Sequence, residues 1–147
     1  MEREIVNPTM EQLCDLMCGK AEDDMINEYE IKIEASVIVS AQDIDDIITT
    51  ALEGGITYWC GCAKVDGEYL GTWASEQVSR GGILKLYDED EEEWLELTKD
   101  NFLIGLKLYL EKDNSILNGK EIDTCQVDAD IADQIIQYAI FGEVIYG

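Results

Sequence analysis

Residues 83–97, ILKLYDEDEEEWLEL, determine the architecture that we predict for this chain. Its two ends, ILKLY and WLEL, alternate apolar and polar residues, which is the pattern of a strand with one face in water. Two such runs joined by a short polar segment predict a β-hairpin. A hairpin tip is exposed, so we expect the six carboxylates between the arms to face solvent: Asp88, Glu89, Asp90, Glu91, Glu92 and Glu93.

Two other segments carry strand patterns. Residues 29–40, YEIKIEASVIVS, alternate strictly and place Ile31, Ile33 and Val37 on one face. Residues 56–65, ITYWCGCAKV, are rich in β-branched and aromatic residues. Together with the hairpin, these segments predict a small antiparallel sheet.

Helix signals lie between the strand patterns. Residues 40–53 begin at Ser40, which has an acid three residues later, and end at Gly54-Gly55, which we interpret as a left-handed cap. Thr98 suits the N-cap of a helix over residues 99–112, and residues 128–141 begin with acids that suit a helix dipole. A further short helix is predicted between Thr9 and Gly19.

Short strands separated by single helices are typical of an α+β fold. We predict a single α+β domain over residues 29–147, in which a small antiparallel sheet has helices packed on one face. Residues 1–28 are predicted to form an N-terminal helical extension.

The charge of the chain excludes several functions. Asp and Glu number 33 against 10 Lys and Arg, a formal net charge of −23, and there is no His. Direct binding of nucleic acid or of an anionic membrane is disfavoured, because both need clustered Lys and Arg. Without His there is no Ser-His or Cys-His pair and no imidazole ligand. We therefore predict a protein that is not an enzyme and holds no metal or cofactor.

The cysteines and the N-terminus bear on location. The chain has five cysteines. Its N-terminal segment is charged from residue 2, unlike a signal peptide, and no window approaches the 18 consecutive apolar residues of a membrane-spanning helix. These features predict reduced thiols and a cytoplasmic protein. The spacing of Cys60 and Cys62 matches the usual zinc knuckles poorly.

Carboxylates spaced like phosphates suggest a nucleic-acid mimic. Alternate residues of an extended strand lie about 6.6 Å apart on one face, so an extended tip would carry a row of acids. Asp43, Asp45 and Asp46 make a possible second patch. The expected partner is a basic nucleic-acid-binding protein.

Two alternatives remain open. The first is a small pocket that sequesters a nucleotide signal, with Trp stacking on the base and Arg80 holding the phosphate, although the overall negative field opposes an anion. Its expected residues are Tyr58, Trp59, Trp73 and Arg80. The second is a self-associating regulatory module, because residues 135–147, IIQYAIFGEVIYG, are apolar enough to form a homodimer interface.

Three stretches carry a resemblance to known proteins: ALEGGITYWCG (51–61), GTWASEQVSRGGILKLYDEDEEEWLELT (71–98) and DADIADQIIQYAIFGEVIYG (128–147). Over about residues 31–147 the chain resembles small acidic phage and prophage proteins of Firmicutes. The resemblance implies a bacterial host cell, where anti-defence inhibitors such as anti-CRISPR and anti-restriction proteins are common. It carries over no catalytic residue. We therefore expect an anti-defence inhibitor that mimics nucleic acid and blocks the DNA- or RNA-binding site of a host enzyme such as a CRISPR nuclease.

Overall fold

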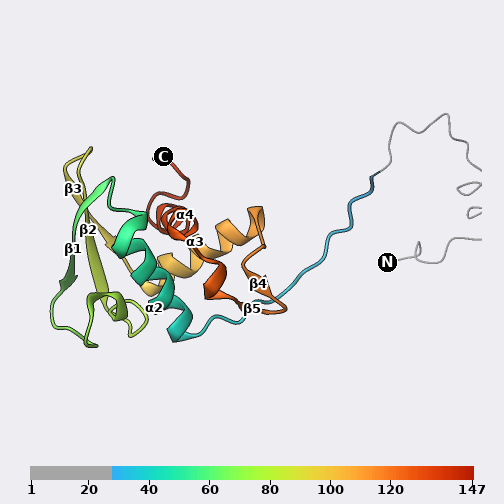
Figure 1. Cartoon of the computed structure of the whole chain (residues 1–147), viewed down its shortest axis with the longest axis horizontal. Coiled ribbons are helices and arrows are strands. Elements are labelled where there is room, and N and C mark those ends of the chain that lie inside the picture. Colours follow the sequence, from blue (N-terminus) through green and yellow to red (C-terminus); the bar gives the residue numbers. More distant parts are fainter. Residues whose placement is uncertain (1–27) are drawn as a thin grey trace, which may run out of the picture. The chain divides into compact units, whose positions relative to one another are not determined.

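The structure, a computed structural model, describes residues 28–147 (Figure 1). The chain divides into two units, Met1–Ala35 and Ser36–Gly147. In the first unit, residues 28–35 form no helix or strand. The helix predicted between Thr9 and Gly19 lies outside the described residues.

The strand predicted over residues 29–40 is wrong. Only Ile38 pairs, through a single parallel bridge to Glu121 in which its N–H donates to the Lys120 carbonyl at 2.7 Å. The neighbouring hairpin, β4 (Leu117–Asn118) and β5 (Glu121–Ile122), has strands of two residues and offers no longer edge. Alternation produces a strand only where a neighbouring strand supplies hydrogen bonds.

The sheet is antiparallel and has the order β1-β2-β3. Its strands are β1 (Cys60–Asp66), β2 (Ile83–Asp88) and β3 (Glu93–Leu97). The predicted hairpin is confirmed, with Leu86 pairing with Ala63 on one side and with Leu95 on the other. Side chains of β2 alternate between half-buried and buried, so that its inward face enters the core.

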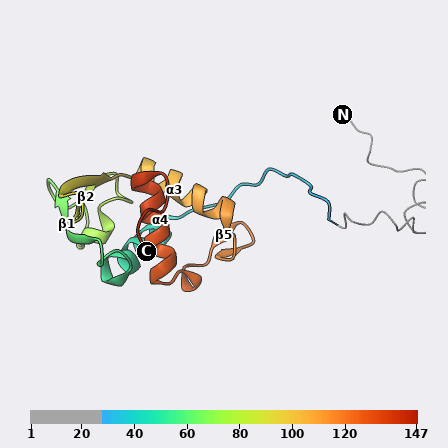
Figure 2. The same cartoon turned by 90° about the horizontal axis from the view of Figure 1, so that it is seen from above.

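Three helices pack together on one face of this sheet (Figures 1 and 2). They are α2 (Ala41–Thr50), α3 (Lys99–Lys112) and α4 (Ala129–Phe141). Ser40 and Thr98 both complete a capping box, and Asp128 accepts a hydrogen bond from the Ile131 N–H. Gly142 ends α4 in the left-handed conformation, with φ of 79°. The three helices predicted within residues 28–147 and the α+β class are therefore confirmed.

Gly54 and Gly55 do not form the predicted left-handed cap. The chain continues from α2 into a π-helical segment, Ala51–Gly55, and neither glycine has a positive φ. Gly55 instead permits a close approach, because a Cβ there would lie 2.7 Å from the carbonyl oxygen of Ala129. Gly55 thus serves the contact with α4 rather than a change of backbone direction, whereas a Cβ on Gly54 would meet nothing within 4 Å.

The core lies between the sheet and the helices. Leu84 and Leu86 of β2 face Phe102 of α3 and Ile135 of α4 in one buried cluster, and all four are fully buried. Between β1 and β2 the chain forms a 3₁₀ turn, Ala74–Glu76, and before α4 it forms another, Thr124–Gln126. None of the helices among residues 28–147 combines the length and the hydropathy that a membrane-spanning segment needs.

Candidate functional site

The tip of the β2–β3 hairpin presents five consecutive exposed carboxylates, Glu89–Glu93, which we call the acidic turn. Residues 89–92 form the turn itself, and Glu93 opens β3. No ion pair found among residues 28–147 involves any of the five. The acidic turn is therefore a local concentration of charge that the described part of the chain does not neutralise.

Asp88 does not belong to this exposed set, which corrects the expectation from the sequence. It is fully buried at the end of β2, because Leu84, Leu86 and Asp88 share the inward face of that strand. Its Oδ1 accepts hydrogen bonds from the N–H groups of Asp90 at 3.0 Å and Glu91 at 3.2 Å. Asp88 thus holds the acidic turn from beneath and offers no carboxylate to a partner.

The extended rows of acids expected at the tip are absent as well. Four turn residues separate the paired Asp88 and Glu93, so the acids do not alternate along a strand. Glu92 adopts a left-handed backbone, with φ of 57°, the one non-glycine residue among those described to do so. This conformation costs a side-chain-bearing residue roughly 1–2 kcal/mol.

Strand β1 supports the acidic turn from the side. The register with β2 shifts between Cys60 and Cys62, which leaves Gly61 in a bulge. The Glu89 side chain occupies the space that a Cβ on Gly61 would need. The Glu89 N–H also donates to the Trp59 carbonyl at 3.0 Å. The start of the turn is therefore fixed to β1 as well as to Asp88.

The second predicted patch is engaged inside the protein. Asp43 completes the capping box of α2. Asp45 accepts a hydrogen bond from the Ser79 hydroxyl at 2.6 Å, and Asp46 accepts one from the Thr124 hydroxyl at 3.2 Å. All three carboxylates are half-buried. Asp43 caps its own helix, whereas Asp45 and Asp46 attach α2 to neighbouring segments, so the structure does not present the three as a free acidic surface.

The residues of the alternative ligand site are not arranged for stacking on a base. Trp59 is only 2% exposed, because Tyr146 stacks on its ring at 5.4 Å and Phe141 packs against it at 5.5 Å. Trp73 is 67% exposed, and the Arg80 guanidinium lies 3.8 Å from the Glu76 carboxylate. The expected stacking surface of Trp59 is thus already covered by the chain itself.

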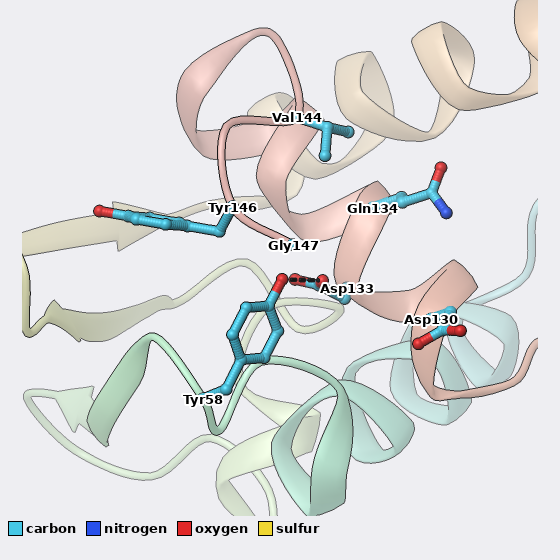
Figure 3. Close-up of a pocket in the computed structure, with 7 residues that line it drawn as sticks. All are labelled: Tyr58, Asp130, Asp133, Gln134, Val144, Tyr146 and Gly147. Carbon is cyan, nitrogen blue, oxygen red and sulfur yellow. Dashed lines mark hydrogen bonds between the residues drawn. The ribbon is translucent and has the colours of Figure 1, made fainter.

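A pocket of about 370 Å³ does lie beside α4, and Tyr58 is the member of the alternative site that lines it (Figure 3). The Tyr58 hydroxyl donates to Asp133 at 2.6 Å. Desolvation and the adjacent Asp133 carboxylate raise the pKa of Tyr58 to about 12, so it remains a hydrogen-bond donor at neutral pH. The full lining is Tyr58, Asp130, Asp133, Gln134, Val144, Tyr146 and Gly147.

The charge of this pocket opposes a nucleotide. Asp130 and Asp133 both line it, and no Lys or Arg does. A phosphate would meet two carboxylates there and would be repelled. The pocket therefore does not provide the phosphate site that the alternative function requires.

A buried polar network behind the pocket was not expected from the sequence. Gln137 is fully buried; its Oε1 accepts from the N–H groups of Ile145 at 2.8 Å and Tyr146 at 2.9 Å, and its Nε2 donates to Asp133 at 2.9 Å. The Trp59 indole N–H also donates to Asp133, at 2.9 Å. The signal in the sequence is the pair Asp133 and Gln137, two polar residues one helical turn apart in a segment, IADQIIQYAI, whose only other strongly polar residue is Gln134.

The apolar end of the chain is largely used within the protein. Ile135, Ile136 and Tyr138 of α4 are buried in the core, which leaves Val144 and Ile145 at 40% and 48% exposure. The surface available for the predicted homodimer is therefore smaller than the sequence of residues 135–147 indicates.

The fold and site together define a small α+β protein whose antiparallel hairpin ends in a supported acidic turn. Within residues 28–147 no group of three Cys, Asp or Glu side chains is placed to hold a metal ion. Comparison of the chain with protein-family models, with curated proteins and with solved structures finds no match.

Proposed function

We propose that the chain is an anti-defence inhibitor that occupies the nucleic-acid-binding cleft of a basic host protein, such as a CRISPR nuclease. The observation that carries this proposal is the acidic turn. Five consecutive carboxylates are exposed at the tip of a hairpin, and a buried aspartate fixes the backbone beneath them. The resemblance to phage proteins supports a bacterial cytoplasm as the setting.

A fixed anionic surface suits a cleft that binds a phosphate backbone. Such a cleft is lined by Lys and Arg, whose counterions are released when a polyanion enters. A turn that is already ordered loses little conformational entropy on binding, so more of the electrostatic attraction appears as affinity. The overall charge of −23 also accelerates the encounter with a basic partner.

The backbone of Glu92 favours a function over simple solubility. Gly or Asn would adopt the left-handed conformation at lower cost. The chain instead places one of the five carboxylates there, between Glu91 and Glu93. Backbone strain retained at one site is commonly associated with binding or catalysis.

Mimicry is tested by asking whether DNA competes for the same partner. The chain is immobilised and exposed to the heparin-retained protein fraction of a Firmicutes lysate, which is enriched in basic nucleic-acid-binding proteins. Bound proteins are then challenged with duplex DNA, or with NaCl of the same ionic strength as a control. We expect DNA to release the partner at concentrations where the matched NaCl does not. Retention of the partner at saturating DNA would contradict mimicry.

A further inference from the structure

A second segment of the chain contacts the carboxylate that holds the acidic turn. After Gly142 the chain reverses, and residues 143–147, which we call the strap, lie against α4 (Figure 3). The strap brings the Tyr146 hydroxyl to 2.9 Å from each carboxylate oxygen of Asp88. One buried aspartate therefore joins the strap to the acidic turn.

The strap is held at three points that do not involve the turn. The Ile145 and Tyr146 N–H groups both donate to the buried Gln137 side chain. The Tyr146 ring stacks on Trp59 with an interplanar angle of 18° and meets Phe141 edge-on. The position of the Tyr146 hydroxyl is thus set by the helix and by the aromatic cluster.

Asp88 depends on this hydroxyl. It is fully buried, its donors are the Tyr146 hydroxyl and the two turn N–H groups, and no described Lys or Arg pairs with it. A buried carboxylate that loses one of a few donors is strongly destabilised. Asp88 would then turn toward water and release the N–H groups of Asp90 and Glu91.

We propose that Tyr146 is a positioning residue of the acidic turn, and that docking of the strap controls whether this turn is ordered. The docked strap stabilises the inward Asp88 carboxylate, and that carboxylate fixes the turn. An undocked strap leaves the five acids in place in the sequence but on a mobile backbone. The part of this inference that concerns partner binding rests on the proposed function.

Amide hydrogen exchange measured by NMR tests the coupling without any partner. Tyr146→Phe keeps the ring stacked on Trp59 and removes only the hydroxyl. We expect the Asp90 and Glu91 amides to exchange about tenfold faster, the effect of losing a hydrogen bond to a charged group. Tyr58→Phe is the matched control, since its hydroxyl contacts Asp133 and the Gln137 Nε2 but neither Asp88 nor the Gln137 Oε1 that holds the strap.

Wild-type exchange rates at Asp90 and Glu91 in Tyr146→Phe, or equal acceleration in both variants, would overturn the inference. A second variant, Gln137→Met, removes the acceptor of the strap N–H groups and leaves Asp88 intact, so it is expected to accelerate the same two amides. If Tyr146→Phe fails to fold, Gln137→Met provides the test. Unchanged amide exchange at Asp90 and Glu91 in Gln137→Met would then overturn the inference.

Binding separates this inference from the proposed function. In the capture experiment, Tyr146→Phe is expected to retain several-fold less of the partner than wild type, although it alters no exposed charge. Faster turn exchange with unchanged capture would leave the coupling intact and contradict the role of an ordered acidic turn in binding.

Discussion

At the scale of single residues, Glu92 carries the backbone strain of the acidic turn, with φ of 57°. Asn tolerates this left-handed conformation better than Glu does. We expect Glu92→Asn to raise the free energy of unfolding by about 1 kcal/mol in urea denaturation. Glu92→Gln removes the same charge but keeps an unfavourable side chain, so it should stabilise less. Equal effects of the two variants would mean that charge repulsion, and not the backbone, is relieved.

Asp88 and Asp90 allow a matched comparison within one acidic run. Asp88 is fully buried and accepts hydrogen bonds from Tyr146 and the turn, whereas Asp90 is exposed. We expect Asp88→Ala to lower the free energy of unfolding by about 2–4 kcal/mol, because it leaves buried donors without acceptors. Asp90→Ala should change it by less than about 0.5 kcal/mol. Similar losses in both would contradict the burial of Asp88.

For single residues, the sequence predicted the exposure of the acidic turn but not the burial of Asp88. The exposure of Glu89 to Glu93 follows from the hairpin pattern. Extending the alternation of Leu84 and Leu86 by two residues would also have placed Asp88 inward. Its partner Tyr146, however, lies 58 residues away, and no local pattern connects the two.

At the scale of secondary structure elements, α3 and α4 meet at Gly105. A Cβ on this residue would overlap the backbone nitrogen of Ala139. Gly105→Ala should therefore separate the helices and lower the free energy of unfolding by about 1–3 kcal/mol. Gly54→Ala is the control, because nothing lies within 4 Å of its Cβ position and its φ is not positive. Chemical denaturation measures the free energy of unfolding of both variants. An equal loss in Gly105→Ala and Gly54→Ala would contradict the close contact between α3 and α4.

Helices were easier to predict than strands in this chain, for a physical reason. The capping boxes at Ser40 and Thr98 are local, and both are formed. Residues 29–40 could form a strand only by pairing with the edge of a strand distant in the sequence. The β4–β5 hairpin offered a single bridge, between Ile38 and Glu121. The π-helical segment Ala51–Gly55 was not predicted, because the close approach of α4 to Gly55 is a tertiary contact.

At the scale of the whole molecule, two tyrosines make stability depend on alkaline pH. Desolvation and the neighbouring Asp133 and Asp88 carboxylates raise the pKa values of Tyr58 and Tyr146 to about 12 from 10.0. The native state holds these protons more tightly than the unfolded state, so their contribution is complete below pH 10 and is lost between pH 10 and 12.

We therefore expect the free energy of unfolding to fall with pH across this interval. The double variant Tyr58→Phe, Tyr146→Phe should show a shallower fall, because it lacks these two hydroxyls. Some fall should remain, because the other tyrosines titrate over the same interval in both proteins. Urea denaturation at closely spaced pH values measures the slope. An unchanged slope in the double variant would contradict the hydrogen bonds of these hydroxyls to Asp133 and Asp88.

The proposed contact with the partner is one particular surface, the acidic turn, rather than the charge of the whole molecule. Two variants that lose the same five negative charges separate these possibilities. One neutralises the acidic turn: Glu89→Gln, Asp90→Asn, Glu91→Gln, Glu92→Gln and Glu93→Gln. The other neutralises five exposed acids elsewhere: Glu34→Gln, Glu53→Gln, Asp66→Asn, Glu68→Gln and Glu111→Gln.

The most direct test is the Kd of a captured, DNA-displaceable partner for wild type and these two variants at one ionic strength. We predict that the turn variant binds at least about 100-fold more weakly, because close charge pairs at an interface contribute several kcal/mol, whereas the control variant stays within about fivefold of wild type. Equal weakening in both variants, or full binding by the turn variant, would contradict the assignment of the acidic turn as the contact surface.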